Sequence, residues 1–212
     1  YQAWNNKGIA LLILGRYEQA ISAYDKALEF KPGDYQAWNN QGIALLILGR
    51  YEQAISAYDK ALEFKPDKDE AWNNKGNALK NLGRYEQAIS AYDKALEFKP
   101  DYDAAWFGKG SAFLQLKLYQ QAIVAYQKSL EIKPGDEFSI SNLGLVKYEI
   151  GKIDEAIEDW QAALEINNQF VESKLALGVT LYNKGKIPES LTIAEVALKL
   201  DKSWGNLQRL KK

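Results

Sequence analysis

The sequence predicts an all-α protein built as a solenoid of helical hairpins. One segment of 34 residues returns along the whole chain, and each copy holds two stretches whose apolar residues recur at helical spacing. The turn residues agree with this prediction, because glycine separates the two stretches and Lys-Pro follows the second one in most copies. No hairpin of this size can bury its apolar faces alone, so we expect neighbouring copies to stack into one continuous core.

The first three copies are nearly identical. Residues 1–34 return as residues 35–68 with 31 of 34 positions matching, and residues 69–102 match the second copy at 27 positions. The copies at 103–136, 137–170 and 171–204 drift but keep the spacing without insertions. We therefore predict a single solenoid domain over residues 1–212, with six hairpins and with residues 205–212 as the start of a C-terminal capping helix.

Each copy predicts two helices, at residues 2–14 and 18–30 in the first. A glycine at the fifteenth position suits a left-handed helix C-cap, and a proline at position 32 ends the second helix. The glycines are Gly15, Gly49, Gly83, Gly151 and Gly185, and the prolines are Pro32, Pro66, Pro100 and Pro134. Pro188 falls in the first turn of its predicted helix, where the missing N–H has no intrahelical acceptor.

Composition excludes several classes of function. Lysine plus arginine number 27 against 28 aspartate plus glutamate, so a net charge of -1 gives no reason to expect nucleic acid or an anionic membrane as a partner. Without cysteine or histidine, the chain lacks disulfides, thiolate nucleophiles, the usual zinc ligands and the commonest general base. We expect no cofactor, no metal site and no enzymatic activity.

The longest apolar run, residues 9–14, is too short to span a bilayer, and no signal peptide opens the chain, so we expect a cytoplasmic protein. The absence of methionine, even at position 1, predicts that the chain is a piece of a longer protein.

Large, small and proline residues stand at fixed positions in each copy. The first has Trp4, Gly8, Leu11, Ala20, Tyr24, Ala27 and Pro32, the second repeats this set, and the third and fourth follow with Trp72 and Trp106. This pattern resembles the tetratricopeptide repeat (TPR) family over almost the whole chain. The resemblance implies a right-handed superhelical solenoid of helix-turn-helix hairpins. The departures are lysine or glutamine at position 7 (Lys7, Gln41, Lys75, Lys109) and the absent proline in the last two copies.

The family pattern implies close helix contacts. Small residues at positions 8, 20 and 27 let helix backbones approach, while the Trp, Leu and Tyr residues fill the space beside them. We expect the tryptophans to be core residues, each costing about 3 to 5 kcal/mol on truncation to alanine. A stacking ladder for bases or sugars is the weaker reading of this series.

In this family the first helices of successive hairpins line a concave groove. The resemblance implies that positions 2, 5, 9, 12 and 13 project into it and bind the partner. The candidate partner-binding residues are Asn5, Ile9, Leu12, Ile13, Asn39, Ile43, Leu46, Ile47, Asn73, Asn77, Lys80, Asn81, Phe107, Leu114, Phe138, Tyr148 and Tyr182.

Asn5, Asn39 and Asn73 form a predicted ladder of amides that can donate to and accept from an extended peptide backbone. The alternative is that repetition copied a neutral surface asparagine. The isoleucines and leucines of the first two copies make a second candidate contact surface, since adjacent exposed apolar residues usually mark an interface. The alternative here is that other parts of the protein cover them.

The residues at particular repeat positions argue against one known class of TPR ligand, the C-terminal tails of chaperones. Chaperone-tail binders of this family hold a terminal carboxylate with Lys and Asn in one repeat and Lys and Arg two repeats later. Here Asn5 and Ile9 occupy the first pair of positions, and Glu70 and Asn74 the last. The sequence therefore predicts no binding to chaperone C-termini.

The sequence favours a protein-protein interaction scaffold that binds a peptide or partner segment in its groove. The alternative is self-association, a homo-oligomer formed through the apolar groove of the first two repeats. An RNA-binding helical repeat is less favoured, because the period is strictly 34 and the groove is neutral. The amino-acid sequence of the first three copies also resembles bacterial, especially cyanobacterial, repeat arrays. Such arrays often accompany a separate effector domain.

Overall fold

The computed structural model describes residues 1–200, and every regular element in that range is an α-helix. Residues 205–212, predicted to begin a capping helix, lie outside the described residues. The chain divides into two compact units, residues 1–117 and 118–212, and the single domain over the whole chain stays a prediction.

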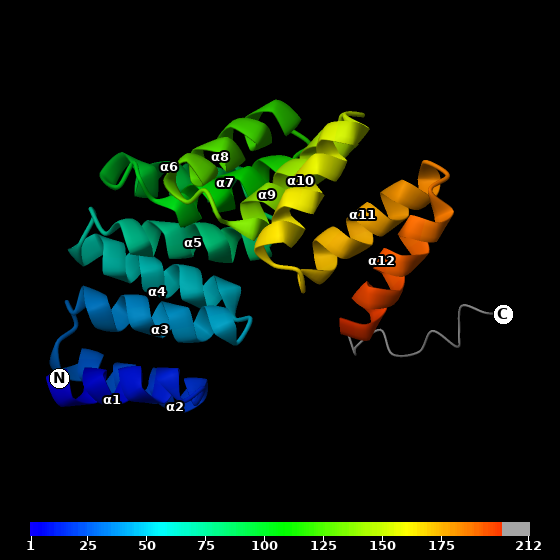
Figure 1. Ribbon diagram of the computed structural model, residues 1–212. Helices are drawn as coiled ribbons and strands as arrows, with labels where there is room; N and C mark the ends of the chain where they lie inside the picture. The colour runs from blue at the N-terminus through cyan, green and yellow to red at the C-terminus, as the bar shows by residue number, and fades with distance from the viewer. Residues whose placement is uncertain (201–212) are drawn as a thin grey trace. The chain divides into compact units, whose positions relative to one another are not determined.

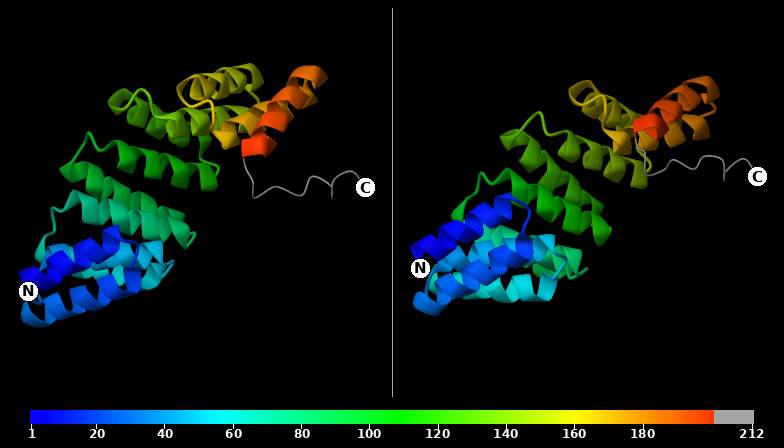
Figure 2. Two further views of the ribbon diagram at one scale, coloured as in Figure 1. Left: turned by 60° about the horizontal axis from the view of Figure 1, so that its bottom comes forward. Right: turned by 90° about the horizontal axis from the view of Figure 1, so that it is seen from below.

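The first unit holds helices α1 to α7, whose arrangement can be followed in Figures 1 and 2. They are α1 (Gln2–Ile13), α2 (Tyr17–Phe30), α3 (Tyr35–Ile47), α4 (Tyr51–Phe64), α5 (Asp69–Asn81), α6 (Tyr85–Phe98) and α7 (Asp103–Gln115). Helices α1, α3 and α5 each pack against the even-numbered helix that follows, and α3, α5 and α7 each pack against the even-numbered helix before. The predicted all-α stack of paired hairpins is thereby confirmed.

The odd-numbered helices of the first unit also pack against one another, α1 on α3, α3 on α5 and α5 on α7. They therefore form a layer of their own. We call the surface of this layer that carries repeat positions 5, 9, 12 and 13 the odd-helix face.

The second unit holds five helices within the described residues. They are α8 (Tyr119–Ile132), α9 (Glu137–Glu149), α10 (Ile153–Ile166), α11 (Val171–Asn183) and α12 (Ile187–Leu200). Its core places Trp160 and Ala156 of α10 against Leu177 and Leu181 of α11, and the Trp160 indole N–H donates to the carbonyl of Ser141 at 3.1 Å.

The predicted glycine caps are confirmed. The glycine after α1, α3, α5, α9 and α11 has a positive φ between 71° and 81° in every case. Lys117 takes the same place after α7 with φ 58°, a conformation that costs a residue with a side chain more than it costs glycine. Pro188 lies in the first turn of α12, as expected.

Packing of the first unit is set by a tyrosine ring lying on a glycine. Tyr24, Tyr58 and Tyr92 are fully buried. A Cβ built on Gly8, Gly42 or Gly76 would lie within 2.6 Å of the matching ring, so only glycine lets the two helices approach this closely. The predicted pairing of small and large positions is confirmed here.

The prediction that the tryptophans fill the core is wrong in part. Trp4 is 36% exposed, and Trp38, Trp72 and Trp106 are half-buried. The indole N–H of each of the latter three donates to a proline carbonyl in the preceding loop (Pro32, Pro66 and Pro100) at 2.8 to 2.9 Å. These rings therefore cover and fasten the loop between hairpins, while tyrosine takes the centre of the core.

The unusual residue at position 7 also has a structural reason. Lys75 and Lys109 lie over the rings of Trp72 and Trp106, and each pairs at 2.5 Å with an aspartate of the previous hairpin, Asp59 or Asp93. Gln41 donates to Asp25 at the equivalent place. Position 7 thus links successive hairpins through a polar contact.

Candidate functional site

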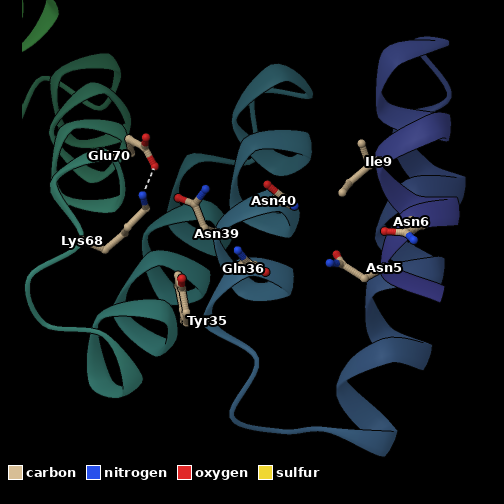
Figure 3. Close-up of a pocket in the computed structure, with 9 residues that line it drawn as sticks. All are labelled: Asn5, Asn6, Ile9, Tyr35, Gln36, Asn39, Asn40, Lys68 and Glu70. Atoms are coloured by element: carbon tan, nitrogen blue, oxygen red, sulfur yellow. Dashed lines mark ion pairs between the residues drawn. The ribbon is translucent and has the colours of Figure 1, made fainter. Parts of the chain in front are cut away.

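A polar hollow of about 280 Å³ opens on the odd-helix face of the first unit (Figure 3). Its lining residues come from α1, α3 and the start of α5: Asn5, Asn6, Ile9, Tyr35, Gln36, Asn39, Asn40, Lys68 and Glu70. Figure 3 shows Asn5 and Ile9 extending from α1 toward α3. The structure therefore brings the first two members of the predicted asparagine ladder together beside an open space.

The ladder asparagines are far more buried than a surface amide. Asn5, Asn39 and Asn73 are 8%, 9% and 5% exposed. The Asn39 Oδ1 accepts from the Asn74 Nδ2 at 3.5 Å, whereas the Oδ1 atoms of Asn5 and Asn73 have no hydrogen-bond partner among the described residues. An unpaired buried acceptor costs about 1 to 3 kcal/mol, so these two positions are unfavourable for folding alone.

The apolar positions divide into covered and open sets. Ile9 and Leu12 of α1 are half-buried and pack on the core cluster of the first hairpin, and Ile43 and Leu46 of α3 pack on that of the second. Ile13 and Ile47, one position further on, are 79% and 51% exposed. Of the predicted apolar surface, the row at position 13 is thus the open part.

The third hairpin carries polar side chains at the same positions. The Tyr92 hydroxyl donates to the Asn77 Oδ1 at 2.8 Å. Lys80 is half-buried and Asn81 is exposed. Lys80 forms no ion pair with a described residue, and its burial lowers the pKa of its ammonium group.

Isoleucine in the first two hairpins leaves the matching tyrosines without that bond. The hydroxyls of Tyr24 and Tyr58 are buried, and neither has a hydrogen-bond partner within residues 1–200. Burial raises the pKa of Tyr24 to about 12, and it also raises the pKa of Tyr58 and Tyr92. All three hydroxyls therefore stay protonated at neutral pH, and of the three the Tyr92 hydroxyl donates a hydrogen bond.

The remaining predicted residues are spread over both units. Phe107 and Leu114 lie on α7 of the first unit and are half-buried. In the second unit, the Phe138 ring meets Phe170 edge-on at 5.0 Å and is 50% exposed. Tyr148 is half-buried with its ring 5.9 Å from that of Trp160, and Tyr182 is 59% exposed. Partner binding by any of the predicted residues stays a prediction.

Six lining residues were absent from the predicted set: Asn6, Tyr35, Gln36, Asn40, Lys68 and Glu70. Lys68 and Glu70 form an ion pair at the start of α5, and the hydrogen bond that Lys68 donates to Glu70 raises the pKa of Lys68. Gln36 and Glu70 occupy position 2, which the family pattern already assigns to the groove. Tyr35 and Lys68 sit at the junction between copies, for which the pattern carried no signal.

Two larger hollows, of about 460 and 500 Å³, lie one repeat apart beside Trp72 and Trp38. Their cations are balanced by ion pairs within the unit: Arg50 with Glu18, Arg84 with Glu52, Lys75 with Asp59, Lys60 with Glu63, and Lys94 with Glu97. They contain no unpaired charge like that of Lys80. Within residues 1–200, no group of acidic or metal-ligating side chains could hold a metal ion.

No helix in the described part of the chain is long and apolar enough to cross a membrane. This finding concerns residues 1–200 alone.

Family models identify the class of protein. A tetratricopeptide repeat model matches residues 5–69 and 73–137, more than half of the chain, and a TPR repeat model matches residues 144–185. The chain therefore belongs to the tetratricopeptide repeat family, as the repeat pattern indicated.

Solved structures share this fold. MamA protein is 26% identical with a TM-score of 0.71, covering 79% of this chain and 92% of its own. PilF of Pseudomonas aeruginosa is 23% identical with a TM-score of 0.81, covering 99% and 94%. YrrB, described as a TPR protein with an unusual peptide-binding site, is 23% identical with a TM-score of 0.65, covering 84% and 92%. Comparison with curated protein sequences gave no match.

Proposed function

We propose that the chain is an interaction scaffold that binds an extended peptide or partner segment on the odd-helix face of its first unit. The observation that carries this proposal is the pair of buried, unpaired Oδ1 atoms on Asn5 and Asn73. Both stand at position 5, beside the polar hollow or along the same row. A peptide backbone offers N–H donors that would satisfy these acceptors.

Two further points support a peptide as the ligand. TPR proteins generally act through protein-protein interaction, and YrrB of the same fold is described as having a peptide-binding site. The open isoleucines at position 13 would then cover apolar side chains of the same segment. In this proposal the scaffold has no catalytic role, and its place in the cytoplasm stays a prediction.

A displayed library of random peptides, selected on the full chain, tests the proposal. Enriched peptides are then synthesised with blocked ends and their affinity is measured by fluorescence anisotropy. We expect Asn73→Ala to weaken binding about tenfold, the effect of one lost hydrogen bond to a buried acceptor. Asn168→Ala is the matched control, because Asn168 is exposed in a loop of the second unit.

The same variant separates function from folding. Asn73→Ala removes an unpaired polar atom, so the variant should unfold at an equal or higher urea concentration than the original chain. Failure to enrich any peptide, or equal affinity of Asn73→Ala and the original chain, would overturn the proposal.

The second candidate is self-association through the apolar part of the same face. Exposure of Ile13 and Ile47 favours it, since exposed isoleucines lose contact with water when two copies pack together. Light scattering over a hundredfold range of concentration measures the molar mass in solution and tests this candidate. The original chain is compared with an Ile13→Lys, Ile47→Lys double variant. An oligomer that becomes monomeric in the variant supports self-association, and monomers throughout exclude it.

A further inference from the structure

Lys80 interrupts an apolar row on the odd-helix face. Position 12 is Leu12 in α1, Leu46 in α3 and Leu114 in α7, but it is lysine in α5. All four side chains are half-buried. A cation has therefore replaced leucine at a place where its neighbours above and below in the layer are apolar.

No carboxylate of the odd-helix layer reaches this cation. The acidic residues of α1, α3, α5 and α7 are Asp69, Glu70 and Asp103, all in the first turn of their helices. Lys80 stands ten residues after Glu70, which is about 15 Å along the helix axis. Glu70 is moreover paired with Lys68, and burial lowers the pKa of Lys80 with no opposing charge to restore it.

The neighbouring asparagines complete an arrangement of donors and one acceptor. Asn73, Asn77 and Lys80 follow at spacings of four and three residues, so their Cβ atoms are about 5 to 6 Å apart on one face of α5. The Tyr92 hydroxyl occupies the Asn77 Oδ1, which leaves the Asn77 Nδ2 as a donor. The buried Oδ1 of Asn73 is an unpaired acceptor.

We propose that Lys80 and the Asn77 amide bind the carboxylate of an aspartate or glutamate within the peptide held on this face, while the Asn73 Oδ1 accepts a backbone N–H. This inference rests on the proposed function and names its ligand class. The carboxylate belongs to a side chain inside the segment, because leucines of α3 and α7 flank Lys80 on both sides and the segment continues over them. The ligand is thus an acidic residue with apolar neighbours.

The test is the same selection from random peptides, run on the full chain and on three variants. On the original chain, aspartate or glutamate should be enriched at one fixed position. Lys80→Gln should abolish this preference, and Lys80→Glu should replace it with lysine or arginine. Lys94→Gln on α6 is the matched control, since Lys94 is exposed and paired with Glu97, and it should leave the preference unchanged.

A synthetic pair of end-blocked peptides, taken from the selection and differing only in Glu against Gln, gives the magnitude. The glutamine peptide should bind the original chain about tenfold more weakly, as expected for a charge-assisted hydrogen bond, and both peptides should bind Lys80→Gln alike. The Lys80 Nζ resonance should titrate at higher pH once the glutamate peptide is bound. Circular dichroism establishes that each variant is folded.

The outcomes separate the two proposals. Enriched peptides without an acidic preference, or a preference that persists in Lys80→Gln, would overturn this inference and leave peptide binding intact. A preference for a free C-terminus, in a parallel library with unblocked ends, would also overturn it. No enrichment on any chain would overturn the proposed function itself.

Discussion

Two chemically identical substitutions should have opposite effects on stability. Helices α4 and α6 share the sequence YEQAISAYDKALEF, and each buries one tyrosine completely, Tyr58 or Tyr92. The Tyr92 hydroxyl donates to Asn77 at 2.8 Å, whereas the Tyr58 hydroxyl has no partner within residues 1–200. Tyr58→Phe and Tyr92→Phe therefore remove the same atom from two different environments.

The magnitudes are worked from hydrogen bonding, because the Tyr58 ring lies on Gly42 as the Tyr92 ring lies on Gly76. The Tyr92 ring also lies against Gly108 of α7. Tyr92→Phe breaks a bond and leaves the Asn77 Oδ1 unpaired, at a cost of about 1 to 2 kcal/mol. Tyr58→Phe removes a donor that is already unpaired, so its effect should lie between neutral and about 1 kcal/mol stabilising. The two variants should differ by about 2 kcal/mol, or roughly 1 M in the urea midpoint.

Urea denaturation followed by circular dichroism measures the difference, and a double-mutant cycle locates it. Ile43→Asn places in α3 the amide that Asn77 provides in α5. It should be better tolerated with Tyr58 present than in the Tyr58→Phe background, by a coupling of about 1 kcal/mol. Equal losses for the two Phe variants, or a coupling of zero, would refute the reasoning.

Three further predictions follow from neighbouring features. Gly42→Ala should destabilise by about 1 to 3 kcal/mol, because its Cβ would lie 2.5 Å from the Tyr58 ring. Gly178→Ala should be neutral or stabilise by up to about 1 kcal/mol, since its Cβ would meet nothing closer than 3.6 Å; equal midpoints in urea would contradict this pair. Asp136→Ala should cost about 1 kcal/mol at neutral pH, because its carboxylate accepts from the Ser139 N–H at 2.9 Å as the cap of α9. Burial alone would raise the pKa of Asp136, but hydrogen bonds from Lys133 and Ser139 outweigh it and lower the pKa below 3.8. The stability it contributes is therefore present above the unfolded pKa of about 4 and lost as pH falls through the folded value, so thermal melts of the variant and the original chain should converge at low pH.

The fold was predictable because its signals are local and repeated. Glycine at position 15, proline at position 32 and the 34-residue period each define a boundary, and the helices begin and end within about one residue of the expected places. The packing of tyrosine on glycine could also be predicted from the sequence, since both residues recur at fixed positions of the repeat.

Burial of the tryptophans was harder to predict, because it depends on the preceding hairpin. Trp38 lies against the loop that carries Pro32, so its exposure is set by a neighbour 6 residues earlier rather than by its own helix. The same holds for position 7, where Lys75 reaches Asp59 in the previous hairpin. Sequence periodicity assigns a face to a residue but does not say how far the next repeat covers that face.

The sequence predicted which residues share the candidate site, but not the burial or hydrogen bonding of their side chains. Family positions placed Asn5 and Asn39 on the same face, but the sequence did not indicate that both side chains are nine-tenths buried. Whether an asparagine oxygen finds a hydrogen-bond partner depends on how neighbouring helices pack. The hydrogen bond from Tyr92 to Asn77 depends on the same packing. In the sequence, Lys80 stood out only as a polar residue at a position that is leucine in other copies. Its lack of an acidic neighbour could be recognised only from the packing of the odd-numbered helices.

In the proposed function, stacking and recognition belong to different helices of the first unit. Helices α2, α4 and α6 are identical in sequence, so the even-numbered layer is constant from one hairpin to the next. The second and third copies differ at seven positions, and three of these are positions 9, 12 and 13 on the odd-helix face, where Ile43, Leu46 and Ile47 become Asn77, Lys80 and Asn81. If the odd-helix face binds the peptide as proposed, a change of ligand can proceed by substitution on this layer without repacking the other. Position 9 is the exception, because Asn77 also satisfies a buried tyrosine, and it is the one place among the three where altering recognition should also alter stability.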